Sequence, residues 1–363
     1  MKVAIRVDAS LQMGSGHVMR CLTLADALRQ MSMQCHFFCR MHSGHLMDLV
    51  RSKGYTVHVL PYGSKQTYID NRLAHAHWLG STQEQDAKAC NSVLQDIQPD
   101  WLIVDHYALD AHWESIVRPS CSRLMVIDDL ADRMHQCDLL LDQNLGRQIA
   151  DYQGLVPAEC KMLMGPNYAL LRPEFALLRC QSVKRRVSTG VTRILVSLGG
   201  VDSDNVTGRV LNAISHASLP ANVTITIVMG AKAPWLGQIR QQAARLPWST
   251  EVLVGIEDMA YQMAISDLAI GAAGSTSWER CALGLPTIMM ILAKNQETVA
   301  HQLENVEAAL VVPLSENFTQ TLISYLHLLI ENDQLRRELT FKASSVTDGQ
   351  GTGRVVKRVS DWS

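Results

Sequence analysis

The segment "MGSGHVMRC", residues 13–21, places two glycines before a histidine and an arginine three positions after it. Histidine is the side chain whose charge changes near neutral pH, so His17 is a candidate general base. Gly14 and Gly16 permit the tight turn that lets such a residue face a ligand. The segment is therefore suited to binding an anion or to acid–base chemistry.

The neighbouring residues predict where His17 lies. "KVAIRVD", residues 2–8, alternates as a short strand does, and the "HVMRCLTLADALRQM" that follows has the apolar spacing of one helical stripe. We expect His17 at a helix start, where the dipole disfavours the imidazolium and leaves a neutral ring able to accept a proton. Asp8, at the end of the strand, is the candidate to orient the ring or an attacking water.

A second segment, "DLAIGAAGSTSWE" at residues 267–279, predicts a strand, a turn at Gly274 and a helix capped by Ser275 and Thr276. Backbone N–H groups and hydroxyls in such a turn would satisfy a diphosphate. Glu279, in the first helical turn, could accept two hydrogen bonds from a ribose diol. A packing turn with an ordinary cap is the alternative, and this segment alone does not decide between them.

The segment "SLGGVDSDN", residues 197–205, repeats this logic with Gly199 and Gly200. Asp202 and Asp204 could hold a divalent metal, but aspartate at a helix start is more often a cap. The cysteines and histidines of residues 35–45 contain no Cys-x-x-Cys pair. We therefore expect no metal.

Strands alternate with helices in both halves of the chain. In the first half the expected strands are "QCHFFCR", "YTVHVLP", "WLIVDHY", "RLMVIDD" and "DLLLDQN", and residues 83–97 form a helix. In the second half they are "RILVSLGG", "VTITIVMG", "TEVLVG", "DLAIGAAG", "PTIMMIL" and "ALVVPL". This alternation predicts α/β architecture with two doubly wound, Rossmann-like domains, whose ligands gather at the carboxyl ends of the strands.

The expected domain boundaries follow from composition. Residues 1–180 form the first domain, and 193–345 form the second. Residues 181–192 are polar, basic and without periodicity, so we interpret them as a linker. Residues 346–363 lack a clear core pattern, and a return to the first domain is left open.

Composition excludes several classes of protein. The chain has 363 residues, 47% of them hydrophobic, with a formal net charge of −2. This balance argues against a nucleic-acid partner, and no apolar run reaches the length of a membrane span. Nine cysteines without regular spacing or a secretory signal are typical of reduced thiols, so we expect a cytoplasmic protein without membrane insertion.

Seven sequence pieces together resemble a known family. In chain order they are Arg6-x-Asp8 with "GSGHVMR", "DHY" at Asp105, "YALLRPEF" at Tyr168, "SLGGVD" at Ser197, "GAAGSTSWE" at Gly271 and "NQ" at Asn295. They resemble the GT-B-type sugar-nucleotide enzymes, and more closely the UDP-2,4-diacetamido-2,4,6-trideoxy-β-L-altropyranose hydrolases of pseudaminic acid biosynthesis. The glycine turns and the glutamate are shared with GT-B transferases, so those pieces alone identify the superfamily and not the reaction.

The resemblance implies a GT-B fold that holds a UDP-sugar across an interdomain cleft, without a cofactor or a required metal. It implies His17 as catalytic base, Glu279 on the ribose, and Ser275 and Thr276 on the diphosphate. The other residues it suggests at the substrate are Gly14, Gly16, Arg20, Tyr168, Arg172, Glu174, Gly199, Gly200, Gly274, Asn295 and Gln296.

The predicted reaction is hydrolysis of the UDP-sugar by water that His17 activates, with C–O cleavage and inversion at the anomeric carbon. UDP is a good leaving group because its charge can be absorbed by the diphosphate site, so the main requirement is a base. Three alternatives stay open: a GT-B glycosyltransferase with a UDP-sugar donor, a UDP-sugar epimerase, and a non-catalytic UDP-sugar-binding protein.

Overall fold

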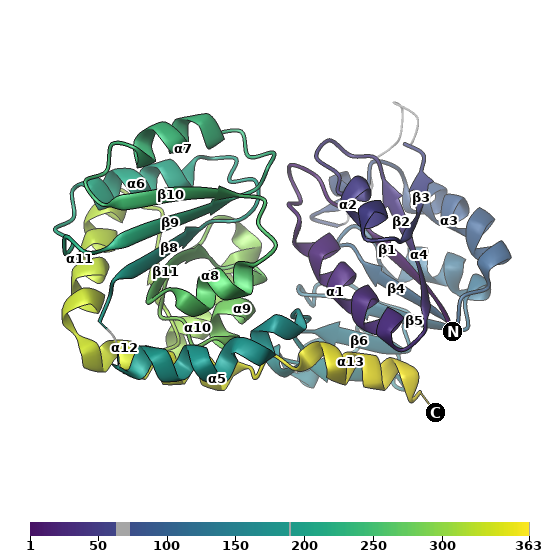
Figure 1. The fold of residues 1–363 in the computed structure, drawn as a ribbon. Helices are drawn as coiled ribbons and strands as arrows, with labels where there is room; N and C mark the ends of the chain where they lie inside the picture. The colour runs from purple at the N-terminus through teal and green to yellow at the C-terminus, as the bar shows by residue number, and fades with distance from the viewer. Residues whose placement is uncertain (63–72, 189, 363) are drawn as a thin grey trace. The chain divides into compact units, whose positions relative to one another are not determined.

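The computed structural model describes residues 1–62, 73–188 and 190–362, which divide into two compact units (Figure 1). Unit 1 comprises Met1–Leu170 and Thr352–Ser363, and unit 2 comprises Leu171–Gly351. Each unit is built on a parallel β-sheet with helices packed against it.

The sheet of unit 1 has seven strands in the order β3-β2-β1-β4-β5-β6-β7. Their bounds are β1 (Lys2–Val7), β2 (Gln34–Arg40), β3 (Thr56–Leu60), β4 (Trp101–Asp105), β5 (Arg123–Ile127), β6 (Leu139–Asp142) and β7 (Lys161–Met164). Alternate residues of β1 enter two separate cores: Val3 and Ile5 pack on the side of α1, and Ala4 packs on the opposite side. Burial on both faces explains why the central strands β4, β5 and β6 are almost wholly apolar.

The helices of unit 1 are α1 (Gly16–Gln30), α2 (Met47–Ser52), α3 (Gln83–Ile97), α4 (Ala111–Val117) and α13 (Gly351–Ser360), with 3₁₀ turns η1 (Ala76–Trp78), η2 (Arg118–Ser120), η3 (Ile149–Tyr152) and η4 (Pro166–Tyr168). The end of the chain belongs to this unit. Val355 and Val359 of α13 are fully buried in its core, and Trp362 lies edge-on to Trp101 with ring centroids 5.0 Å apart.

The sheet of unit 2 has six parallel strands in the order β10-β9-β8-β11-β12-β13. Their bounds are β8 (Arg193–Ser197), β9 (Thr224–Met229), β10 (Ser249–Val254), β11 (Leu268–Ala272), β12 (Thr287–Met290) and β13 (Leu310–Val312). The helices are α5 (Pro173–Ser188), α6 (Val206–Ser215), α7 (Leu236–Ala243), α8 (Met259–Ile265), α9 (Thr276–Ala282), α10 (Glu297–Asn305), α11 (Phe318–Glu331) and α12 (Asp333–Val346), with η5 (Lys294–Gln296).

The strand orders identify one ligand-binding position in each sheet. From β1 the chain builds outward through β2 and β3, and then returns to place β4 on the other side of β1. In unit 2 the same reversal places β8 beside β11. Ligands of doubly wound sheets bind at the carboxyl ends of the strands where the order reverses, so the loops after β1, β4, β8 and β11 are the expected ligand-binding positions.

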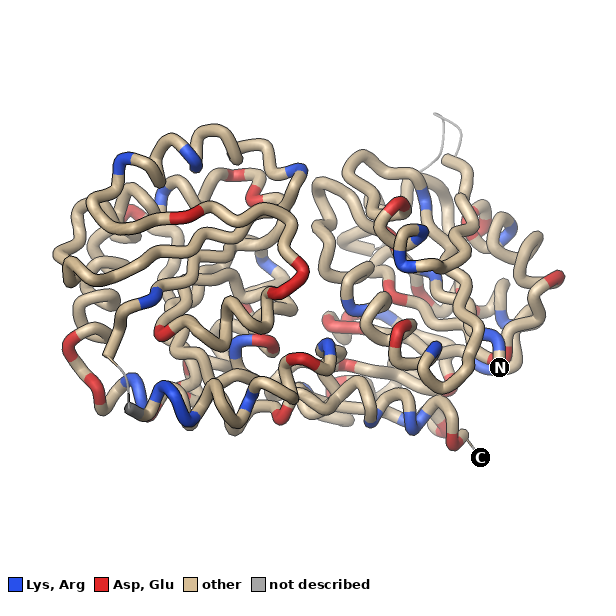
Figure 2. The backbone as a smooth tube through the Cα atoms, viewed as in Figure 1, with Lys and Arg blue, Asp and Glu red and all other residues tan. Residues whose placement is uncertain are grey.

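The expected linker at residues 181–192 is wrong for most of its length, because α5 continues to Ser188. Basic residues form a run of blue along α5 in Figure 2, and two of them, Arg185 and Arg186, bind groups of unit 2. Buried Arg186 donates to the carbonyl oxygens of Met263, Ser266 and Leu283 at 2.5–2.9 Å. Burial, together with the charge of Arg185, lowers the pKa of Arg186 to about 9. A stretch that looks solvated in the sequence is thus a helix that binds the carboxyl ends of α8 and α9.

The boundary between the units consequently differs from the expected one. Unit 2 begins at Leu171, ten residues before the predicted linker, so all of α5 belongs to it. Within the described residues, no helix is long and apolar enough to cross a membrane.

Candidate functional site

His17 is bound by a carboxylate at the reversal point of the unit 1 sheet. It is the second residue of α1, and its ring Nδ1 lies 2.6 Å from Oδ1 of Asp105, the last residue of β4. The Asp105 side chain is fully buried, whereas His17 keeps 12% of its side chain exposed. The imidazole is therefore held from the protein interior while part of it reaches the surface.

Arg20 clamps the same carboxylate one helical turn further on. Its Nε and Nη2 donate to the two oxygens of Asp105, each at 2.7 Å. Burial alone would raise the pKa of Asp105, but the charges of Arg20 and His17 outweigh it and hold this pKa well below its usual value. An ionised carboxylate only accepts hydrogen bonds, so Nδ1 of His17 carries the proton. In the neutral ring the lone pair then lies on Nε2, as a general base requires.

The expectation that Asp8 orients His17 is wrong. Asp8 forms an ion pair with Arg6 at 2.8 Å, accepts from the backbone N–H of Arg40 at 2.6 Å and lies 3.3 Å from Nε2 of His106. The alternation of strands explains the difference. Arg6 and Asp8 face the side of the sheet covered by α3, where Arg6 also binds Asp86, whereas β4 directs Asp105 toward α1.

Two further residues surround His17 that sequence reasoning did not assign. The Tyr107 ring packs against the imidazole at a centroid distance of 4.6 Å and an interplanar angle of 86°. The Tyr107 hydroxyl donates to Oδ2 of Asp129 at 2.7 Å, and Nη1 of Arg20 lies 2.7 Å from the same oxygen. Tyr107 and Asp129 could have been found from the polar residues "DHY" and "DD" that end two predicted strands.

In unit 2 the predicted turn between β11 and α9 is present and Ser275 lies at the predicted cap position, but the expected capping hydrogen bond is not formed. Ser275 is the N-cap residue of α9 with helical backbone angles, and its side chain accepts no capping hydrogen bond. The Thr276 hydroxyl accepts from Nη1 of Arg280 at 3.0 Å instead. Arg280 also donates to the Ala272 carbonyl at 2.6 Å, and a Cβ at Gly271 would lie 2.6 Å from its guanidinium. One buried arginine thus shapes the turn and leaves the Ser275 hydroxyl exposed.

Glu279 is half-buried on the first turn of α9, and no hydrogen bond is found to its carboxylate among the described residues. Burial raises its pKa, while the charges of Arg172 and Arg280 oppose the shift and that of Glu174 adds to it. Arg172 donates to the Glu257 carbonyl at 2.7 Å, so its guanidinium is fixed near Glu279. The charges of Arg172, Glu174 and Arg280 therefore all act on the Glu279 carboxyl.

The remaining predicted residues of unit 2 lie in two places, near the turn after β11 and in the loop after β8. A Cβ on Gly274 would lie 3.9 Å from Nε2 of Gln296, whose Oε1 accepts from the Leu292 N–H at 2.9 Å, so Gln296 lies against the turn. Asn295 is exposed on the same 3₁₀ turn. After β8, Gly199 has a φ of +98°.

The Gly200 carbonyl lies so close to Gly230 that a Cβ at Gly230 would come within 2.1 Å of it. Asp202 accepts from the N–H groups of Val206 and Thr207, both at 2.9 Å, which confirms its interpretation as a cap. No three His, Cys, Asp or Glu side chains of the described segments gather in a metal-binding arrangement.

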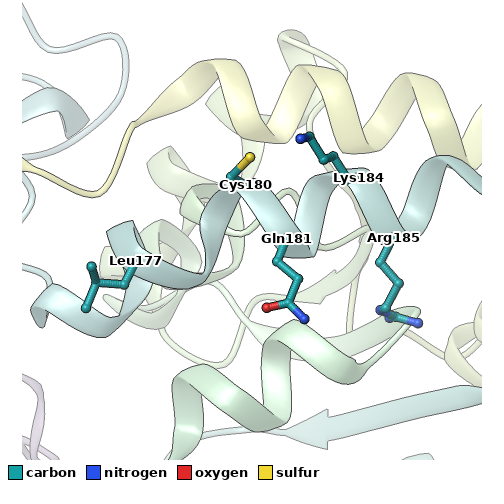
Figure 3. Close-up of a pocket in the computed structure, with 5 residues that line it drawn as sticks. All are labelled: Leu177, Cys180, Gln181, Lys184 and Arg185. Atoms are coloured by element: carbon teal, nitrogen blue, oxygen red, sulfur yellow. The ribbon is translucent and has the colours of Figure 1, made fainter.

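The unit 1 candidates are not all at His17. Gly14, with a φ of +75°, and Gly16 flank the start of α1, whereas Tyr168 is half-buried in η4 against the unit 1 core. A hollow of about 610 Å³ lies elsewhere, along α5 (Figure 3). Its five lining residues include none of the candidates; they are Leu177, Cys180, Gln181, Lys184 and Arg185.

Comparisons with known proteins agree with this architecture. Residues 194–350 match the family model described as the glycosyltransferase family 28 C-terminal domain. A crystal structure of Acinetobacter baumannii MurG superposes with a TM-score of 0.70 at 16% identity, covering 99% of both chains. The chain has the GT-B fold.

Two relatives extend over most of the chain. UDP-2,4-diacetamido-2,4,6-trideoxy-β-L-altropyranose hydrolase of Campylobacter jejuni is 26% identical over 300 residues, which cover 83% of this chain and 95% of that protein. The uncharacterized protein MJ1062 of Methanocaldococcus jannaschii is 24% identical over 324 residues, 88% of this chain. The match spans only 61% of the length of MJ1062.

Proposed function

We propose that this protein hydrolyses UDP-2,4-diacetamido-2,4,6-trideoxy-β-L-altropyranose to UDP and the free sugar. The observation that carries the proposal is the imidazole of His17, held through Nδ1 by ionised Asp105 with Nε2 left to accept a proton. The relation to the Campylobacter jejuni hydrolase, which the alignment covers almost completely, supports the choice of substrate.

In the proposed reaction, Nε2 of His17 takes a proton from water as the water oxygen attacks the anomeric carbon. The bond between that carbon and the diphosphate oxygen breaks, and UDP leaves with the bonding electrons, so the carbon is inverted. The role assigned to unit 2 is to hold UDP: Glu279 accepts from the ribose hydroxyls, and Ser275 and Thr276 bind the diphosphate, whose developing charge their N–H groups stabilise. The reaction needs neither a metal nor a cofactor.

A glycosyltransferase is the second candidate. The match of residues 194–350 to a glycosyltransferase domain favours it, because the same donor site would serve transfer to an acceptor hydroxyl. His17 would then deprotonate that hydroxyl in place of water. The two functions differ only in whether turnover occurs without an acceptor.

The test is to incubate the purified full-length chain with the UDP-sugar in ¹⁸O-water, without an acceptor, and to analyse both products by mass spectrometry. Hydrolysis with C–O cleavage releases UDP that carries no ¹⁸O and a sugar labelled at the anomeric position. The free sugar also exchanges this oxygen with water, so the unlabelled UDP is the decisive product, and His17→Asn is the control. No turnover would favour the transferase or a binding protein, and an altered but intact UDP-sugar would indicate an epimerase.

A further inference from the structure

Asp129 contacts both groups that flank His17. It follows β5, the strand beside β4, and its Oδ2 lies 2.7 Å from the Tyr107 hydroxyl and 2.7 Å from Nη1 of Arg20. Arg20 also holds Asp105 and approaches Nδ1 of His17 to 3.3 Å, and the Tyr107 ring packs against the imidazole. One carboxylate oxygen therefore restrains the imidazole through two independent neighbours.

The backbone that carries Asp129 is itself fixed. Its carbonyl oxygen accepts from Nδ2 of Asn144 at 3.0 Å and from Nη2 of Arg147 at 3.1 Å. Both donors are anchored on the buried carboxylate of Asp142, which accepts from the Asn144 N–H at 2.9 Å and from Nε of Arg147 at 2.8 Å. The backbone of Asp129 is thus fixed by residues at and after the end of β6, independently of the side-chain contacts with Arg20 and Tyr107.

We propose that Asp129 is a positioning residue for His17, an inference that rests on the proposed function of His17 as general base. Asp129 acts through Arg20 and Tyr107 and touches no reacting atom. Without its charge, Arg20 keeps only one of its two carboxylate partners and Tyr107 binds a weaker acceptor. The ring is then free to tilt, and a misplacement of about 1 Å at a reacting group can cost about 10²-fold in rate.

The test compares Asp129→Asn with Asp132→Asn, a control three residues away whose side chain is 46% exposed. Each variant is labelled with ¹⁵N-histidine, and the His17 ring signals, assigned with His17→Asn, report its tautomer by NMR. In wild type we expect the Nδ1–H tautomer. In Asp129→Asn we expect a mixed or shifted signal, a kcat lower by about 10–100-fold and a KM within about twofold, because nucleotide binding is assigned to unit 2. Asp132→Asn should change neither readout.

A second variant, Tyr107→Phe, keeps the ring and removes only the hydroxyl that binds Asp129. It should change the His17 signals in the same direction with a smaller loss of kcat, and it decides the question if Asp129→Asn does not fold. Wild-type His17 signals and kcat in a folded Asp129→Asn protein, or in Tyr107→Phe if Asp129→Asn does not fold, would overturn the inference. If His17→Ala instead hydrolyses the substrate at the wild-type rate, the proposed function fails, and the NMR comparison still shows whether Asp129 positions the ring.

Discussion

In unit 1 the residues at the carboxyl edge of the sheet are bound to one another by buried ion pairs. His17, Asp105, Arg20 and Asp129 form a chain of contacts between 2.6 and 2.7 Å. In unit 2 the corresponding edge consists of glycine turns, and Glu279 projects from it without a hydrogen bond to any described residue. A base must be held in one orientation before the substrate arrives, whereas a binding turn needs donors and acceptors that are still free. This difference agrees with the proposed function, which places the chemistry in unit 1 and nucleotide binding in unit 2.

The largest expected effect comes from removing the base in unit 1. His17→Ala should lower kcat by about 10²–10⁴-fold, the usual contribution of a general base, and leave the Kd for UDP within about twofold. Stopped assays of UDP release give the first value, and isothermal titration gives the second. His301→Ala, at a histidine with a side chain that is 62% exposed, is the matched control. A loss of UDP affinity in His17→Ala would contradict the division between the units.

The reciprocal change in unit 2 should act on binding. Glu279→Gln removes the charge that the ribose hydroxyls are proposed to meet, so the Kd for UDP should rise by about 10–100-fold with kcat changed only a few-fold. The measurements are made at pH 8, because burial raises the pKa of Glu279 and a higher pH favours the ionised carboxylate. Glu297→Gln, at an exposed position, should bind UDP as wild type does. Unchanged UDP affinity in Glu279→Gln would show that Glu279 is not the acceptor of the ribose hydroxyls.

Local patterns were sufficient to predict the turns and most strands, because each depends on a few consecutive residues. The turn after β11 and the helix that begins at Gly16 follow from glycine positions and apolar spacing, as does α3 at Gln83–Ile97. The short strand β7, "KMLM", was not predicted, since four residues carry too little alternation to stand out.

The partner of His17 could not be predicted from the sequence because it depends on strand order. Asp8 is nine residues from His17 and Asp105 is 88 residues away, but β4 pairs directly with β1 and directs Asp105 toward α1. The linker was wrong for a related reason. The distant carbonyl groups that bind Arg186 belong to residues 77–97 positions away. In both cases long-range contacts outweigh the local pattern.

The buried carboxyl groups of unit 1 also include one that binds a proton more tightly than usual. The single proton of the Tyr152 hydroxyl lies between Oδ2 of Asp128 and Oδ2 of Asp142, each at 2.8 Å. Arg133 binds Asp128 and Arg147 binds Asp142, both at 2.8 Å, so each of the two carboxyls has one cationic partner. Burial, with the nearby charge of Asp129, raises the pKa of Asp142 to about 7.

This raised pKa predicts a specific pH dependence of stability. The folded protein binds the proton more tightly than the unfolded chain, so the contribution is present below about pH 4 and is lost as pH rises through about 7. Asp142→Asn mimics the protonated form. The stability of wild type relative to this variant should therefore fall by on the order of 2 kcal/mol between pH 5 and pH 8. Urea unfolding measures it, with Asp48→Asn, at an 82% exposed side chain, as control. Parallel pH curves for wild type and Asp142→Asn would show that Asp142 does not hold the proton.

The smallest effect is expected from metal removal. This experiment tests whether Asp202 and Asp204 of unit 2 have a structural role or hold a metal. Asp202 has a φ of +46°, and its two oxygens already accept from Val206 and Thr207, so a metal would have to displace both bonds at the start of α6. EDTA at millimolar concentration should therefore leave kcat and KM unchanged within error. If activity disappeared and Mg²⁺ restored it, Asp202→Asn and Asp204→Asn would need testing as ligand variants. The edge of unit 2 would then hold a cation, and the diphosphate would no longer depend on backbone N–H groups alone.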